Sequence, residues 1–191
     1  FSCPNIIGSR VYPEILRILN NEHAYINISL KINPTFKITH DMSQGKVDIG
    51  LVYLNEPIQP IKNYQEYEIS KEKHVLVCSP NHPLAARHDL SIMDLQKEQM
   101  IVYNRTFKTK ADQYLRKKGL KQYNIMEIQN MEWIIMTLKK GVGIAFIYQT
   151  IVKEELKRGE LIELIPIEDM PRTTLSVFIN NDLPKDVGES I

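Results

Sequence analysis

The histidines and acidic residues of this sequence lack the spacings that catalytic or metal-binding chemistry requires. His82 and His88 are spaced too loosely, with no cysteines beside them, to indicate a zinc site. His40 and Asp41 are adjacent, so in a helix their side chains point apart and are poorly placed to form half of a catalytic triad. The sequence contains no GxSxG, GxGxxG, Walker or HExxH motif. We therefore predict a protein that is not an enzyme and needs no metal or cofactor.

Cys3 and one run of basic residues each allow two interpretations, one functional and one structural. Cys3 and Cys78 are the only thiols and are far apart in sequence. Cys3 in a loop is either a reactive thiol or, as we favour, an inert or ligand-lining residue, since nothing in the sequence indicates a lowered pKa. Arg116–Lys118 with Lys121 could touch phosphate, but cations at a helix end also complement the helix dipole. We favour a solvated helix end.

The stretch from Asn130 to Tyr148 predicts a cap, a helix, a glycine turn and a buried strand. Asn130 can accept a backbone N–H at the helix start, and Gly141 can adopt the left-handed conformation that ends the helix. One apolar stripe follows the helical spacing i, i+3, i+4, i+7, and its members are Met131, Ile134, Ile135 and Leu138. A helix start of this kind is a polar site for a ligand, although an ordinary core unit has the same pattern.

The composition is that of an ordinary globular chain. Its 191 residues are 43% hydrophobic and 25% charged, with a net charge of +1, which gives no indication of a nucleic-acid or anionic-membrane surface. No apolar run is long enough to span a bilayer, and no secretion signal opens the chain. We predict a cytoplasmic protein. The abrupt apolar start at Phe1 indicates a segment cut from a longer chain.

The order of elements predicts two βαβ-rich halves. Phe1–Ile7 should be a strand end and a loop, and a helix should follow from about Ser9. Tyr25–Ile32 alternates polar and apolar residues and predicts a strand with one buried face. The later predicted strands are at 47–52, 64–70, 74–78, 100–103, 123–128, 161–165 and 174–179. The later predicted helices run from Thr35 to Ser43, over 90–95 (short), over 106–118, and to about Arg158, where Gly159 ends the last one.

Four segments in order resemble one known family. Residues 2–19 and Gly45–Gly50 resemble the first lobe of the effector-binding domain of LysR-type transcriptional regulators. Asn81–Ala85 resembles the HPLA turn of its second lobe, and Gly141–Ala145 resembles its GxGIA turn and strand. Each motif alone is weak, but their order and spacing agree over nearly the whole chain.

The resemblance implies an α/β fold of the periplasmic-binding-protein type 2 kind, with two Rossmann-like lobes joined by two crossover strands. We place the crossings near Ile69–Lys71 and Pro166–Glu168. Lobe I is then 1–70 plus 167–191, and lobe II is 71–166. The family's N-terminal DNA-binding domain would be absent from this chain.

The resemblance also places an effector cleft between the lobes. Its predicted residues in lobe I are Cys3, Pro4, Asn5, Ile6 and Thr35, and those in lobe II are Arg105, Thr106, Phe107, Gln129, Asn130 and Tyr148. Helix N-termini, a hydroxyl and a guanidinium converging on one crevice favour a small anion such as a carboxylate. Thr35 and Asn130 could instead only cap their helices, and Arg105 could point to solvent.

Some positions depart from the family pattern. Pro4 and Ile6 stand where the family often has hydroxyl side chains. This weakens the inference that hydroxyl groups of this loop bind a carboxylate. Tyr148 replaces a common proline and either brings a phenol toward the cleft or closes the strand end. Peroxide sensing needs a cysteine pair in lobe II, where only Cys78 lies, so we disfavour it.

We conclude that the sequence encodes the effector-sensing domain of a LysR-type regulator. Its predicted partners are a small-molecule effector, a second copy in a homodimer, a tetramer at full length, and operator DNA through the missing domain, with no membrane. The dimer contact would use the helix after Ser9 and the Tyr25 strand. One alternative is the solute-binding protein of a transporter, which an export signal upstream of Phe1 would reveal. The other is an enzyme with the same fold, which turnover of a bound ligand would reveal.

Overall fold

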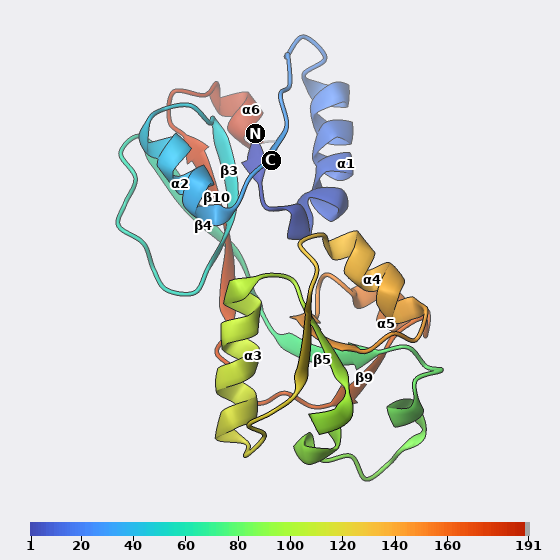
Figure 1. The fold of residues 1–191 in the computed structure, drawn as a ribbon. Coiled ribbons are helices and arrows are strands. Elements are labelled where there is room, and N and C mark those ends of the chain that lie inside the picture. The colour runs from blue at the N-terminus through green and yellow to red at the C-terminus, as the bar shows by residue number, and fades with distance from the viewer. Residues whose placement is uncertain (190–191) are drawn as a thin grey trace. The chain divides into compact units, whose positions relative to one another are not determined.

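The computed structural model describes residues 1–189 and divides into two compact units (Figure 1). Unit 1 comprises Phe1–Lys71 and the described residues from Thr173 onward, and unit 2 is Glu72–Arg172. We predicted the second crossing at 166–168. Residues 167–172 remain with unit 2, because Ile167 and Met170 are buried and Asp169 accepts a hydrogen bond from Lys118.

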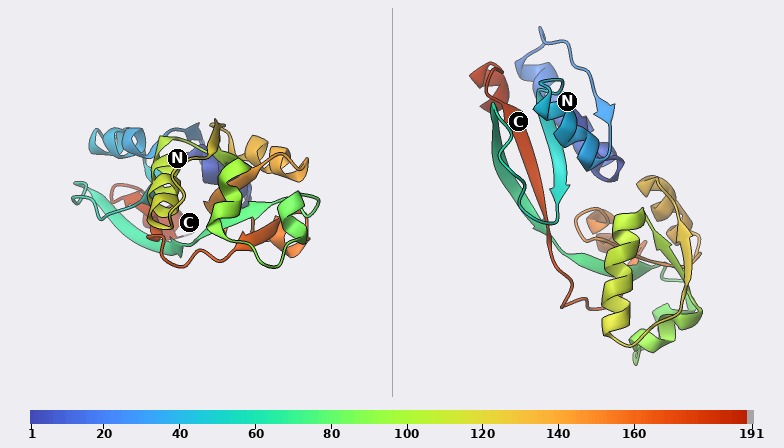
Figure 2. Two further views of the ribbon diagram at one scale, coloured as in Figure 1. Left: turned by 60° about the horizontal axis from the view of Figure 1, so that its bottom comes forward. Right: turned by 60° about the vertical axis from the view of Figure 1, so that its left-hand side comes forward.

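Unit 1 contains one five-stranded sheet in the order β2-β1-β3-β10-β4. The strands β1, β2 and β3 are parallel, and β10 is antiparallel to β3. Figure 2 shows β10 (red) beside β3 and β4. The elements of this unit are β1 (Ser2–Cys3), α1 (Asn5–Glu22), β2 (Lys31–Ile32), α2 (Thr35–Ser43), β3 (Ile49–Leu54), β4 (Tyr64–Glu72), β10 (Thr173–Asn180) and α6 (Lys185–Glu189).

Two sequence predictions in unit 1 are wrong. Helix α1 begins at Asn5 rather than near Ser9, because Pro4 has the extended conformation of an N-cap residue (φ −68°, ψ 149°) and Pro13 is tolerated inside the helix. The predicted strand over 25–32 shrinks to the two residues of β2, and Ile28 and Ile32 are exposed. Alternation indicates a buried face only where something covers the sheet, and β2 is an edge strand.

The helices of unit 1 are fixed by separate apolar contacts. Ile38 and Met42 of α2 form one core cluster with Val52, Leu54 and Phe178 of the sheet. Helix α1 uses Ile15 and Leu19, which pack with Val187 of α6. Removing side chains of this size from water stabilises a fold by about 1.5–3 kcal/mol each. This packing holds α1, which follows β1, and α2, which follows β2, in place.

Unit 2 contains a second five-stranded sheet in the order β7-β6-β8-β5-β9. β6 is parallel to β7 and β8, whereas β5 is antiparallel to β8 and β9. The elements are β5 (His74–Cys78), two short 3₁₀ helices (Pro83–Ala86 and Ile92–Lys97), β6 (Gln99–Val102), α3 (Arg105–Lys117), β7 (Asn124–Glu127), α4 (Met131–Lys139), β8 (Ile144–Tyr148), α5 (Lys153–Lys157) and β9 (Ile162–Ile165).

The local structure predicted for residues 130–148 is confirmed. The side-chain oxygen of Asn130 accepts a hydrogen bond from the Trp133 amide at 3.0 Å, and all four members of the predicted stripe are buried. Gly141 has a φ of +80° and ends α4, and all of β8 is buried. The α/β class is also confirmed, because both units contain parallel strands connected by helices.

The HPLA turn is a structural cap. His82 Nδ1 accepts a hydrogen bond from the Leu84 amide, and its Nε2 lies 3.3 Å from a Glu98 oxygen. Because Nδ1 is an acceptor, Nε2 carries the proton and can donate to that carboxylate. His82 is therefore an N-cap residue that also connects the turn to Glu98, the residue before β6.

Candidate functional site

In unit 1 the predicted site residues lie where two parallel strands end. Cys3 of β1 pairs with Ile32 of β2, so α1 and α2 begin at the same edge of the sheet. The amide of Asn33 donates to the Cys3 carbonyl at 3.0 Å, and its side chain donates to Ser2 Oγ at 3.1 Å. These bonds hold together the two loops that carry the predicted residues.

Both helices of this edge start after a proline. Pro4 and Pro34 occupy the N-cap positions of α1 and α2, and a proline side chain has no oxygen with which to accept an amide hydrogen. The first amides of a helix have no acceptor within the helix. Their dipoles therefore favour an anion at this edge. Thr35 is the first residue of α2 and is half-buried there, so it does not cap the helix as we had considered; Pro34 holds the N-cap position.

Within this edge Cys3 is a core residue rather than a surface thiol. Its side chain is fully buried, and Sγ lies 3.4 Å from the Pro4 carbonyl oxygen. Burial raises the pKa of the Cys3 thiol to about 11, and burial likewise raises the pKa of Cys78 to about 12. The thiolate is the reactive form of cysteine, so both side chains are protected.

We therefore expect both cysteines of the native chain to resist a thiol reagent at pH 8. The reason is the combination of burial with a raised pKa, which leaves very little accessible thiolate. Colour release from a disulfide reagent should be near zero in buffer and should reach two equivalents in denaturant. A Cys78→Ser variant that still reacts rapidly in buffer would show that Cys3 is a reactive thiol.

In unit 2 the second set of residues lies at the corresponding edge. β6, β7 and β8 are parallel, so the starts of α3 and α4 and the end of β8 lie on one side of the sheet. Here the caps are asparagines: Asn104 accepts from the Phe107 amide at 3.1 Å, and Asn130 caps α4. In unit 1 the amides at the same third helical position, those of Ile7 and Lys37, instead donate to the carbonyl oxygens of Pro4 and Pro34.

The predicted residues of α3 divide into an exposed pair and a buried one. Arg105 and Thr106 are exposed in the first turn, and Phe107 is buried. The Phe107 ring lies 4.9 Å from the ring of Tyr148, which is 2% exposed at the end of β8. Of the two roles considered for Tyr148, the structure places it in an aromatic cluster that closes the strand end.

His74 was not singled out from the sequence, yet it lies in this cluster. Its ring is 4.8 Å from that of Tyr148 and 5.9 Å from that of Phe107. It is 2% exposed, and neither ring nitrogen has a hydrogen-bond partner among the described residues. Leaving a buried polar group unpaired costs about 1–3 kcal/mol. Burial, reinforced by the charge of Lys110, lowers the pKa of His74 to about 3, so the ring is neutral at physiological pH.

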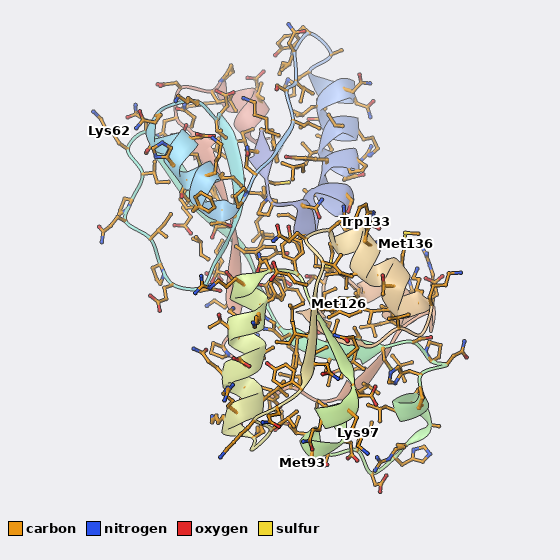
Figure 3. All side chains as sticks on the ribbon, in the orientation of Figure 1. Lys62, Met93, Lys97, Met126, Trp133 and Met136 are labelled. Atoms are coloured by element: carbon orange, nitrogen blue, oxygen red, sulfur yellow. The ribbon has the colours of Figure 1, made fainter. Side chains whose placement is uncertain are left out.

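Gln129 and Asn130 line an open groove of about 750 Å³ beside α4. Gln129 donates to a Glu127 oxygen at 2.7 Å, and the exposed side chains of Trp133 and Met136 form the apolar wall. Figure 3 shows these last two residues side by side on α4. The only tryptophan of the sequence thus lies beside two of the predicted residues.

Two kinds of site are missing from the part of the chain that the structure describes. Among residues 1–189, no three histidine, cysteine, aspartate or glutamate side chains are grouped so that they could hold a metal ion. No helix in the same range combines the length and the apolar character that crossing a membrane requires.

A family model described as the LysR substrate binding domain matches residues 1–185. Among the relatives, a probable RuBisCO transcriptional regulator of Trieres chinensis is 28% identical over 182 residues, which are 92% of this chain and 59% of that protein. The HTH-type transcriptional regulator CysL of Bacillus subtilis is 26% identical over 160 residues, 81% of this chain and 52% of that protein.

Two solved structures of similar fold come from regulatory proteins. The regulatory domain of CcmR from Synechocystis PCC6803, in complex with 2-PG, has a TM-score of 0.72 at 20% identity and covers 96% of this chain and 87% of that one. Full-length LysG of Corynebacterium glutamicum, with bound effector Arg, has a TM-score of 0.76 at 13% identity. The match covers 99% of this chain and 64% of that one. The predicted periplasmic-binding-protein type 2 fold is confirmed by these likenesses.

Proposed function

Since this chain belongs to the LysR substrate binding domain family, we propose that it is the effector-sensing part of a transcriptional regulator. The observation that carries the proposal is the family match across residues 1–185. The chain spans 59%, 57% and 60% of three curated relatives it matches. In our proposal the remaining part of the protein binds operator DNA, and the effector biases that binding by favouring one arrangement of the two units.

The proposed effector is a small organic anion, which each of the two sets of residues described above is suited to bind. Support comes from the proline-capped starts of α1 and α2 in unit 1 and from the exposed Arg105 at the start of α3 in unit 2. Helix N-termini and a guanidinium both favour carboxylate or phosphate oxygens. Two proteins of similar fold were solved with small molecules, CcmR with 2-PG and LysG with the effector arginine, whose carboxylate is an anionic group.

The relatives do not favour our two alternatives. The matched curated proteins that we compare are transcriptional regulators, which supports a regulator over a transporter's solute-binding protein. Regulators of this family are generally not enzymes, and the lack of turnover remains part of our proposal.

The test is a panel of small anions followed by titration. Thermal unfolding would be measured with 2-PG, inorganic phosphate, L-arginine and further small carboxylates, and compounds that raise the melting temperature would be titrated by calorimetry. We expect at least one anion to bind with one-to-one stoichiometry. A chain that binds no anion of the panel, or that converts one to product, would contradict the proposal.

We also propose that the chain forms a homodimer, and a tetramer at full length. The contact would use α1 and residues 25–32, where Tyr25, Ile28 and Ile32 are exposed. Sedimentation at micromolar concentration should show a dimer, and Ile28→Asp should shift it to a monomer because a charge would enter the contact. Met93→Asp, at an exposed apolar position in unit 2, is the control and should stay dimeric. A wild-type monomer would refute the contact.

A further inference from the structure

The aromatic cluster at the start of α3 contains a polar group for which the described residues offer no partner. His74 is 2% exposed, and both of its ring nitrogens are without a hydrogen bond. Buried side-chain polar atoms in folded proteins are nearly always paired, so an unpaired imidazole calls for an explanation. A group that is paired only when a ligand is bound provides one.

The position of His74 in the sheet supports that explanation. β5 is antiparallel to β8, and His74 pairs with Tyr148, so the first residue of β5 lies at the edge where β8 ends. The parallel pair β6 and β8 places the start of α3 at the same edge. His74 contacts Phe107, which belongs to the first turn of that 13-residue helix. The imidazole therefore lies beside the first turn of α3, next to the ring of Phe107.

The chemistry around His74 defines the group that it could bind. A neutral imidazole has one N–H donor and one acceptor nitrogen. Arg105 and Lys110 place two cations on the same helix, and the charge of Lys110 opposes protonation of His74. A positively charged ligand group is thereby disfavoured, and an anionic oxygen that accepts a hydrogen bond is favoured. The rings of Phe107 and Tyr148 exclude water from that bond.

We propose that His74 is a specificity-determining contact that donates an N–H to an oxygen of the anionic effector at the start of α3. This inference rests on the proposed function and adds to it a residue and a direction of hydrogen bonding. The effector would then need an oxygen acceptor next to a part that tolerates two aromatic rings.

The test compares His74→Leu with the wild-type chain, using 2-PG, inorganic phosphate and L-arginine as probes. Leucine has a similar volume and no polar atom. We expect His74→Leu without probe to melt at a higher temperature, because an unpaired buried group is removed, yet to bind the probe about 10-fold or more weakly. A residue with a merely structural role would not raise stability while lowering affinity. His88→Leu, which removes an exposed histidine, should behave like wild type.

The outcomes separate this inference from the proposed function. Unchanged affinity of His74→Leu for a probe that the wild type binds would overturn the role of His74 and leave the effector proposal in place. If the wild type bound none of the probes, both would fail together.

Should His74→Leu not fold, a second variant replaces it: His74→Gln keeps a donor and an acceptor. The affinity of His74→Gln for the probe should lie between the wild-type affinity and a tenfold weaker one. In a separate measurement on the wild-type chain, the ¹⁵N chemical shifts of the His74 ring should change when the probe binds. Absence of that change would overturn the inference.

Discussion

Replacing Gly143 by alanine should reduce the free energy of unfolding by about 3–5 kcal/mol, from left-handed strain and overpacking together. Gly143 has a φ of +67°, and a Cβ built there would lie 2.3 Å from the backbone carbonyl oxygen of Gln99. That oxygen belongs to β6, which pairs with β8 and cannot move away without breaking the sheet. Chemical denaturation of the variant would measure the loss.

Gly141→Ala is the matched control for this experiment. Gly141 also has a positive φ, +80°, but nothing lies within 4 Å of a Cβ built there. It should lose only about 1 kcal/mol, from backbone strain alone. Equal losses for the two variants would show that the contact with Gln99 is not what requires glycine at position 143.

Replacing Arg105 by alanine should weaken binding of the anionic effector by about 10- to 100-fold, the usual strength of a hydrogen bond to a charged group. Arg105 is exposed at the first position of α3, so the change removes no core packing and the melting temperature without ligand should stay close to wild type. Calorimetric titration with the panel anion that binds wild type would measure the affinity.

Arg116→Ala is the control for a general effect of charge. Arg116 lies near the end of the same helix, 3.7 Å from Asp112, and is also solvent-exposed. It should leave the affinity unchanged. Thr35→Ala should weaken binding less than Arg105→Ala, since only one partner is charged in a hydroxyl–anion hydrogen bond and both are charged in a guanidinium–anion pair. Wild-type affinity in both Arg105→Ala and Thr35→Ala would refute the site that we propose.

The sequence alone determined the local structure wherever short-range physics was sufficient. The stripe of α4, its Asn130 cap and the glycines that follow depend on spacing and backbone conformation within one segment, and the structure has them as predicted. The ordered motifs likewise indicated the family, which the match over residues 1–185 bears out. The strand predicted over 25–32 failed, because its alternation required a covering layer that an edge strand lacks.

Only the tertiary structure decided which residues are brought together. Cys3 reads from the sequence as a loop thiol, but the β1–β2 pairing and the burial around it make it a protected core residue. His74 has no motif, and its meeting with Phe107 and Tyr148 depends on the antiparallel pairing of strands more than sixty residues apart in sequence. Burial and hydrogen-bond satisfaction are properties of such long-range pairings, so no local pattern could have predicted an unpaired imidazole at that edge.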